Sequence, residues 1–154
     1  MKLIIKRLHE DAKIPKYQSD KASGFDLHAL EDVKIDSLTV NIIRTGLAIQ
    51  LPPDTEMVIR PRSGLSVKFP GYVANSPGTI DEDYRGEIMI IAYNPKWNAD
   101  IYVKKGDRIA QGVVCPVIRC EIEEGELDET ERGGGGFGST GIEEVDTKNG
   151  KATL

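Results

Sequence analysis

Short apolar stretches, separated by glycine, proline and aspartate, recur from the first residues to about residue 117. No stretch keeps a helical period, and the best helix candidate is one short turn after Pro61. Many short strands with turn residues between them predict an all-β fold, either a sandwich or a barrel. The predicted strands are Leu3–Leu8, Phe25–Ala29, Leu38–Arg44, Ala48–Leu51, Glu56–Arg60, Glu87–Tyr93, Ile101–Val103 and Arg108–Val117.

The stretch Ile88–Tyr93 is apolar at every position, so both faces of this strand are apolar. A strand with one solvated face alternates apolar and polar residues instead. We therefore expect the second face to be covered by a second sheet or by a partner subunit. A central strand in a monomeric sandwich explains the same pattern.

The composition changes abruptly after residue 120. Seven of the eleven residues from 121 to 131 are acidic and none is aromatic, which is typical of a solvated connector. A glycine-rich segment, 132–141, comes next. A polar tail, 142–154, ends the chain, and we expect it to be disordered. The sequence thus predicts an all-β domain over 1–120, followed by these three segments.

Length, charge and cysteine content narrow the function classes. A chain of 154 residues is one domain by its size. The net charge of −5 argues against a general nucleic-acid binder, which presents a basic patch. We expect no membrane span, because no apolar run approaches the roughly 20 residues that a span needs. We expect no signal peptide, because a strand-like stretch directly follows Met1. Cys115 and Cys120 have an odd spacing, which disfavours a disulfide and fits free thiols in a reducing cytoplasm.

The stretch Gly78–Ile88 carries the strongest candidate for catalysis. β-Branched Thr79 and Ile80 lead into a reversal flanked by glycines, and an apolar arm follows. This order predicts a hairpin whose turn carries Asp81 and Tyr84. A carboxylate beside an aromatic ring at a hairpin turn can act as a general base, next to a ring that restricts the shape of the substrate. The alternative is a solvated acidic turn.

Three further sites could bind a ligand or be structural. Ser63 and Gly64 begin a predicted helical turn whose N–H groups could meet an anion, and Arg62 adds planar donors. Gln111 is polar on an apolar strand, which predicts either a core hydrogen bond or a ligand contact. Asp26, taken alone, is expected to be a surface carboxylate.

The glycine-rich segment Arg132–Gly141 contains Phe137 and two hydroxyl residues among its glycines. A flexible linker explains a run of glycines. The order of an arginine, an aromatic ring and hydroxyl groups suits a flap that closes over a nucleotide. In such a flap the arginine meets the terminal phosphate and the ring stacks on a base.

Five segments resemble, in order, the five motifs of the trimeric dUTP pyrophosphatase (dUTPase) family. The first and second motifs carry Ser23 and Ser66 where the family pattern has alanine. The five segments are Ser23–Ala29, Pro61–Ser66, Gly78–Glu87, Gly106–Gln111 and Arg132–Gly141.

The resemblance implies a jelly-roll-like β-barrel, of the dUTPase-like β-clip type, that forms a homotrimer with shared active sites. It implies hydrolysis of dUTP to dUMP and pyrophosphate with Mg²⁺. Asp81 would activate the attacking water, and Asp26 would hold Mg²⁺ through the water shell of the metal. Asn75 would read the uracil edge, and the Tyr84 ring would exclude a 2′-OH. The implied substrate-binding residues are Arg62, Ser63, Gly64, Asn75, Gly78, Thr79, Ile80, Asp81, Tyr84, Met89, Gln111, Arg132, Phe137, Gly138 and Ser139.

Two alternatives stay open at this point. One is deamination of dCTP on the same fold, against which Tyr84 and the complete glycine-rich segment argue. The other is a non-catalytic, nucleotide-sensing trimer, against which the intact Asp81 and Arg132 argue.

Overall fold

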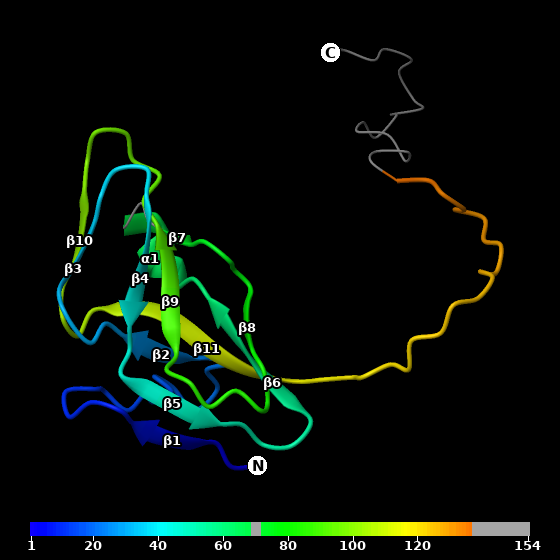
Figure 1. Cartoon of the computed structure of the whole chain (residues 1–154), viewed down its shortest axis with the longest axis horizontal. Coiled ribbons are helices and arrows are strands. Elements are labelled where there is room, and N and C mark those ends of the chain that lie inside the picture. Colours follow the sequence, from blue (N-terminus) through cyan, green and yellow to red (C-terminus); the bar gives the residue numbers. More distant parts are fainter. Residues whose placement is uncertain (69–71, 137–154) are drawn as a thin grey trace, which may run out of the picture. The chain divides into compact units, whose positions relative to one another are not determined.

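A computed structural model describes residues 1–68 and 72–136 (Figure 1). The contacts between residues divide the chain into two units, Met1–Arg119 and Cys120–Leu154. The helix and the strands of the described residues all belong to the first unit. The described part of the second unit is irregular except for a turn near Gly133, where the Arg132 Nε donates to the Gly135 carbonyl at 2.9 Å.

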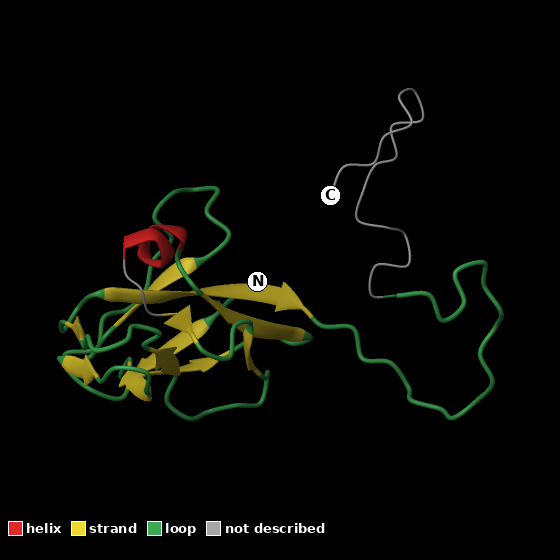
Figure 2. Ribbon diagram, turned by 90° about the horizontal axis from the view of Figure 1, so that it is seen from above, coloured by secondary structure: helices red, strands yellow, loops and turns green. Residues whose placement is uncertain are grey.

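Eleven strands and one short helix form the first unit over the described residues, and the helix lies at the edge of the strands (Figure 2). The elements are β1 (Ile4–Arg7), β2 (Phe25–His28), β3 (Val33–Ile35), β4 (Val40–Arg44), β5 (Leu47–Gln50), β6 (Thr55–Arg60), α1 (Ser63–Lys68), β7 (Tyr72–Val73), β8 (Gly78–Ile80), β9 (Met89–Tyr93), β10 (Ile101–Val103) and β11 (Arg108–Pro116).

The strands pair into four small antiparallel sheets within the described residues. The largest has the order β2-β11-β6-β8, and the second has the order β4-β9-β7. β1 pairs with β5, and β3 pairs with β10. Neighbours in a sheet are thus far apart in sequence, as in a jelly roll. The prediction of an all-β, jelly-roll-like fold is confirmed.

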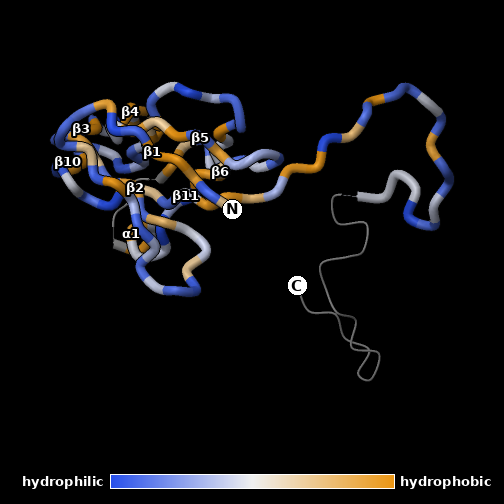
Figure 3. Tube along the Cα trace, turned by 90° about the horizontal axis from the view of Figure 1, so that it is seen from below, coloured by the Kyte–Doolittle hydropathy of each residue, from blue (hydrophilic) through white to orange (hydrophobic). Residues whose placement is uncertain are grey.

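One hydrophobic core joins the sheets. Apolar residues concentrate on the strands and hydrophilic residues on the loops between them (Figure 3). Leu27, Ile35, Met57 and Ile90 are at most 1% exposed, and they come from β2, β3, β6 and β9. Packing between residues that are distant in sequence holds in place the strands that carry the candidate site residues described below.

The predicted hairpin of Gly78–Ile80 with Ile88–Tyr93 is wrong. β8 pairs with β6, whereas β9 pairs with β4 and β7. The second arm pairs with β4 over five positions, from Met89 opposite Arg44 to Tyr93 opposite Val40. Just before it, Ile88 N donates to the Leu47 carbonyl of β5 at 2.7 Å. The residues between β8 and β9 therefore form a loop that bridges two sheets, which we call the 81–87 loop.

Most strand bounds differ from the predicted ones by one or two residues, and β10 agrees with its prediction. β3 and β7 were not predicted, because they have only three and two residues. β9 is the central strand of its sheet, but its sheet keeps an exposed apolar face. Val40, Ile42 and Met89 are 56%, 51% and 42% exposed there. Among the described residues, no helix has the length and apolar character needed to cross a bilayer.

Candidate active site

A buried carboxylate held by two arginines lies on β2. Asp26 is only 7% exposed, so the interpretation of Asp26 as a surface carboxylate is wrong. Its Oδ1 accepts from the Arg62 Nε at 2.5 Å, and its Oδ2 accepts from the Arg108 Nη1 at 3.2 Å. The arginines neutralise the charge and satisfy part of the hydrogen-bonding capacity of the buried carboxylate.

The central sheet brings these three residues together. β11 lies between β2 and β6, with Gln111 opposite both Asp26 and Arg60. Arg62 follows the end of β6, and Arg108 begins β11, where an irregular register separates it from Ala110. Sequence reasoning included Arg108 in a motif but gave it no role. Its partner lies 82 residues away, so local patterns carry no signal for this pair.

Gln111 makes the core hydrogen bond that its sequence pattern allowed. Its Nε2 donates to the Pro61 carbonyl at 2.8 Å and fixes the segment that carries Arg62. An amide NH₂ has two hydrogens, and one is enough for this bond.

Ser63 and Gly64 open α1 and are both exposed. A side chain at Gly64 would meet nothing within 4 Å, so packing within this chain does not require glycine there. The predicted helical turn after Pro61 is confirmed as α1, whose Leu65 and Ser66 amides both bond to the Arg62 carbonyl.

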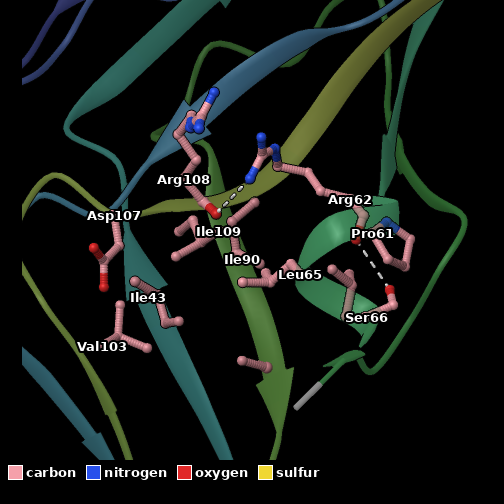
Figure 4. Close-up of a pocket in the computed structure, with 12 residues that line it drawn as sticks. Ile43, Pro61, Arg62, Leu65, Ser66, Ile90, Val103, Asp107, Arg108 and Ile109 are labelled. Atoms are coloured by element: carbon pink, nitrogen blue, oxygen red, sulfur yellow. Dashed lines mark hydrogen bonds between the residues drawn. The ribbon is translucent and has the colours of Figure 1, made fainter. Parts of the chain in front are cut away.

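A cavity of about 310 Å³ opens between α1 and the strands (Figure 4). Apolar side chains such as Ile43, Leu65 and Ile90 form most of its walls, to which Ser66 and Asp107 also contribute. Arg62 and Arg108 lie side by side at its edge (Figure 4). The Arg62 Nη1 donates to the Arg108 carbonyl at 3.5 Å. The two guanidinium groups thus form a positive edge beside the buried Asp26.

His28 ends β2 near the same charges. Burial lowers its pKa, and the positive charge of Lys13 lowers it further. The Nδ1 of His28 is buried and has no hydrogen-bond partner among the described residues. His28 is therefore disposed to stay neutral.

The second group of predicted residues lies around β8. Asn75 is exposed and lies before the cis peptide bond between Ser76 and Pro77. Its side chain lies against Gly78, where a Cβ atom would come within 2.9 Å of the Asn75 Nδ2. Only glycine at position 78 allows this approach without displacing the amide. Thr79 is exposed, and Ile80 is half-buried opposite Met57.

The Tyr84 ring lies across Gly86 in the 81–87 loop. Tyr84 is 37% exposed, and its hydroxyl donates to the Glu87 carbonyl at 3.0 Å. A side chain at Gly86 would collide with the ring, so glycine is needed there. The Glu87 carboxylate in turn binds the Arg44 guanidinium and raises the pKa of Arg44. The same carboxylate accepts a hydrogen bond from Gly46 N at 2.8 Å. This network fastens the second end of the loop to β4.

Asp81 is exposed and lines an open hollow that Glu82, Asp83 and Asp54 also line. The backbone carbonyl of Asp81 accepts from Tyr84 N at 3.2 Å, which closes the turn between them. Asp81 is thus an exposed residue of the lining of this hollow, and Tyr84, three positions later, is not packed into the core. Met89, 42% exposed, begins the strand that follows.

Asp81 and Arg62 lie toward opposite ends of β6, whereas Gly78 pairs with Ile59, close to the end that leads to Arg62. Ile80 lies opposite Met57 near the start of β6, whereas Arg62 follows Arg60 at its end. Met57 and Arg60 are already roughly 10 Å apart at the usual strand rise, and Asp81 and Arg62 lie beyond them. Arg132 is exposed in the second unit, and Phe137, Gly138 and Ser139 lie outside the described residues.

Known proteins resemble this chain over nearly its whole length. A model of the dUTPase family matches residues 10–141. The chain belongs to the dUTPase family. A deoxyuridine 5'-triphosphate nucleotidohydrolase of Nautilia profundicola is 53% identical over 142 residues, which cover 92% of this chain and 99% of the relative. The protein of that name from Helicobacter pylori is 50% identical over 143 residues, covering 92% and 98%.

A solved dUTPase has the same fold. A mutant dUTPase of Staphylococcus bacteriophage 80alpha, solved with dUpNHpp, superposes with a TM-score of 0.86 at 25% identity. The alignment covers 92% of this chain and 99% of the phage protein. The chain therefore has the dUTPase fold over most of its length.

The described residues of this dUTPase-family chain can contact a metal ion only through water molecules bound to the ion. They contain no group of three or more His, Cys, Asp or Glu side chains that could hold a metal ion. Asp26 offers one carboxylate, and two of its lone-pair positions are taken by arginines. Mg²⁺ keeps several waters and takes ligands from phosphates, so one carboxylate in its outer shell is compatible with the site.

Proposed function

We propose that this protein hydrolyses dUTP to dUMP and pyrophosphate, which keeps uracil out of DNA and supplies dUMP for thymidylate synthesis. Membership of the dUTPase family and the names of its relatives support this activity. The structural observation that carries it is the exposed Asp81 carboxylate at an open hollow, three residues from the exposed Tyr84 ring. Neither relatives nor motifs favour deamination of dCTP.

The nucleoside would be held around β8. Asn75 and the backbone of Gly78, Thr79 and Ile80 offer donors and acceptors for the uracil edge. The Tyr84 ring is fixed by its hydroxyl bond to Glu87, so it can exclude a 2′-OH without moving. Met89 begins β9 with an exposed thioether side chain that could border the sugar.

The phosphate chain would be held by the groups around the buried Asp26. Arg62, Ser63 and Gly64 would contact phosphate oxygens, and Gln111 would use its second amide hydrogen. Asp26 holds the Arg62 guanidinium in place before substrate arrives, which reduces the cost of ordering that side chain. Arg132, Phe137, Gly138 and Ser139 of the glycine-rich segment would close over the nucleotide.

In the reaction, the Asp81 carboxylate accepts a proton from a water molecule as the water oxygen attacks the α-phosphorus. The bond from that phosphorus to the bridging oxygen breaks in line, and pyrophosphate leaves with the bonding electron pair. A positioned general base contributes roughly 10²–10⁴-fold to such a rate. The arginines and backbone N–H groups stabilise the charge that develops on the phosphate oxygens.

Mg²⁺ is the proposed cofactor, and Asp26 is the residue that would meet its water shell. When bound to the phosphates, the ion would neutralise part of their charge and orient them. The side-chain geometry of Asp26 supports only this indirect contact, because its oxygens already accept from Arg62 and Arg108.

We further propose that the active form is a homotrimer with shared active sites. Support comes from the separation of Asp81 and Arg62 along β6, because one chain alone does not present base and phosphate ligands together. The exposed apolar side chains of Val40, Ile42 and Met89 would be covered by another subunit. The two unbonded cysteines fit a cytoplasmic location, which we propose as well.

Pyrophosphate release with dUTP, UTP, dCTP and dTTP in the presence of Mg²⁺ tests the activity. We expect release from dUTP alone, and ammonia from none of the four. Asp81→Asn should bind dUTP within a few-fold of the wild type and lose turnover. Asp83→Asn, in the same loop, is the matched control and should keep turnover. Unchanged turnover in Asp81→Asn would refute the role of Asp81 as base.

A further inference from the structure

The hollow beside Asp81 holds one arginine that no motif includes. Arg119 is the single cation among the described residues that line this hollow. The remaining charged residues of its lining are all carboxylates: Asp54, Glu56, Asp81, Glu82 and Asp83. Carboxylates this close together repel one another, and a cation among them reduces this repulsion.

Arg119 binds two of these carboxylates at once. Its Nη1 lies 3.3 Å from the Asp54 Oδ1, and its Nη2 lies 3.3 Å from the Glu82 Oε2. The same Glu82 oxygen accepts from the backbone N–H of Asp54 at 3.0 Å. The Glu82 side chain is therefore held between a backbone donor and the Arg119 guanidinium.

These contacts join three segments that are distant in sequence. The turn before β6 contributes Asp54, whose φ of 58° is in the left-handed region. The 81–87 loop contributes Glu82. The segment after β11 contributes Arg119 and also bonds to the turn, because Val117 N donates to the Asp54 carbonyl at 3.0 Å.

Glu82 is the neighbour of Asp81, so its anchoring bears on the proposed base. The second end of the loop is anchored by Glu87 to Arg44 and Gly46, as described above. The loop that carries Asp81 is thus fastened by one glutamate near each end. Arg119 completes the fastening at the end next to Asp81.

We propose that Arg119 is a positioning residue for Asp81. Its ion pair with Glu82 sets the start of the 81–87 loop and so the direction of the Asp81 carboxylate. Side chains of Arg119 and Glu82 are 61% and 32% exposed, so the pair adds little to folding stability. A small misplacement of a reacting group can nevertheless lower a rate strongly. This inference rests on the proposed role of Asp81.

The test compares Arg119→Ala, Glu82→Gln and the double variant in steady-state hydrolysis of dUTP. We expect kcat at saturating dUTP and Mg²⁺ to fall about threefold to tenfold in Arg119→Ala, with KM within about twofold. Glu82→Gln should lower kcat similarly, and the double variant should fall no further, because the two single changes share the loss of the Arg119–Glu82 ion pair. Arg119→Lys should recover part of kcat.

Lys104→Ala is the matched control. It removes another exposed ion pair, between Lys104 and Asp32 at 2.9 Å, and should leave kcat unchanged. The proposal is overturned by a wild-type kcat in Arg119→Ala, by multiplicative losses in the double variant, or by a rise in KM alone. An inactive wild type, or an active Asp81→Asn, would instead overturn the proposed function.

Discussion

Replacing Asp26 by asparagine removes one negative charge from a buried position and keeps the shape of the side chain. In the native protein this carboxylate accepts from Arg62 and Arg108, and both arginines come from other strands of the sheet or their ends. The asparagine carbonyl can still accept one of these hydrogen bonds. Its NH₂ group would face the other guanidinium as a donor facing a donor.

The expected cost follows from the burial of the three side chains. Removing one partner of a fully buried ion pair costs about 3–5 kcal/mol, because the remaining charge is left uncompensated. The Arg62 and Arg108 side chains are 24% and 48% exposed, so water compensates part of that loss. We therefore expect a destabilisation of roughly 1–3 kcal/mol. At 2–4 °C per kcal/mol, the melting temperature should fall by about 2–12 °C.

Thermal unfolding followed by circular dichroism at fixed protein concentration measures this effect. Asp32→Asn is the matched control, because Asp32 also pairs with a cation but its side chain is 62% exposed. We expect no measurable shift for the control. If Asp26→Asn has the same melting temperature as the wild type, the two arginine contacts do not stabilise the fold, and the assigned electrostatic role of Asp26 is wrong.

The same variant separates the two roles given to Asp26. If the carboxylate also meets the water shell of Mg²⁺, the Mg²⁺ concentration for half-maximal hydrolysis should rise several-fold. Arg108→Gln removes one arginine contact and leaves the carboxylate, so it should change stability more than the Mg²⁺ requirement. If Asp26→Asn and the wild type need the same Mg²⁺ concentration, Asp26 does not contact the water shell of Mg²⁺, and its role is limited to binding the two arginines.

Three further predictions concern assembly and closure. A chain that ends before Arg132 should still fold and assemble but should lose most dUTP hydrolysis; normal turnover would exclude a role for the glycine-rich segment. Ile42→Asp places a charge on the exposed apolar face of β4 and should give a folded monomer in sedimentation, whereas Tyr102→Asp on β10 should leave assembly unchanged. Inactive Asp81→Asn and inactive Arg62→Ala chains, refolded together, should regain part of the activity, because a mixed trimer forms sites with both residues intact; no recovery at all would argue against shared sites.

The strands that sequence reasoning predicted well are those whose own side chains define the core. β10 alternates between buried Ile101 and Val103 and exposed Tyr102, so its bounds follow from its pattern alone. β7 has two residues, and its pairing with β9 depends on a partner about twenty residues away. Strand pairing of this kind is a property of the assembled core, which is why the local hairpin prediction for Gly78–Tyr93 was wrong.

The environment of Asp26 was equally hidden from local reasoning. Its counterions lie 36 and 82 residues away, so no window around Asp26 contains the reason for its burial. The resemblance to the five motifs identified the family, because it depends on the order of these motifs along nearly the whole chain. It gave no role to Arg119, which lies between the fourth and fifth motifs.

β6 links the two halves of the proposed chemistry. Met57–Ile59 of this strand pair with β8, which runs toward the start of β6 and leads into the loop with Asp81, and beyond the end of β6 the chain turns through Pro61 to Arg62. A strand is stiff, so it holds these halves apart as firmly as it holds each in place. In the proposed reaction, this rigidity keeps Asp81 and Arg62 of one chain from meeting at the same phosphate chain. The proposed homotrimer resolves this separation, because in it each subunit would supply the base to one neighbour and the phosphate ligands to another.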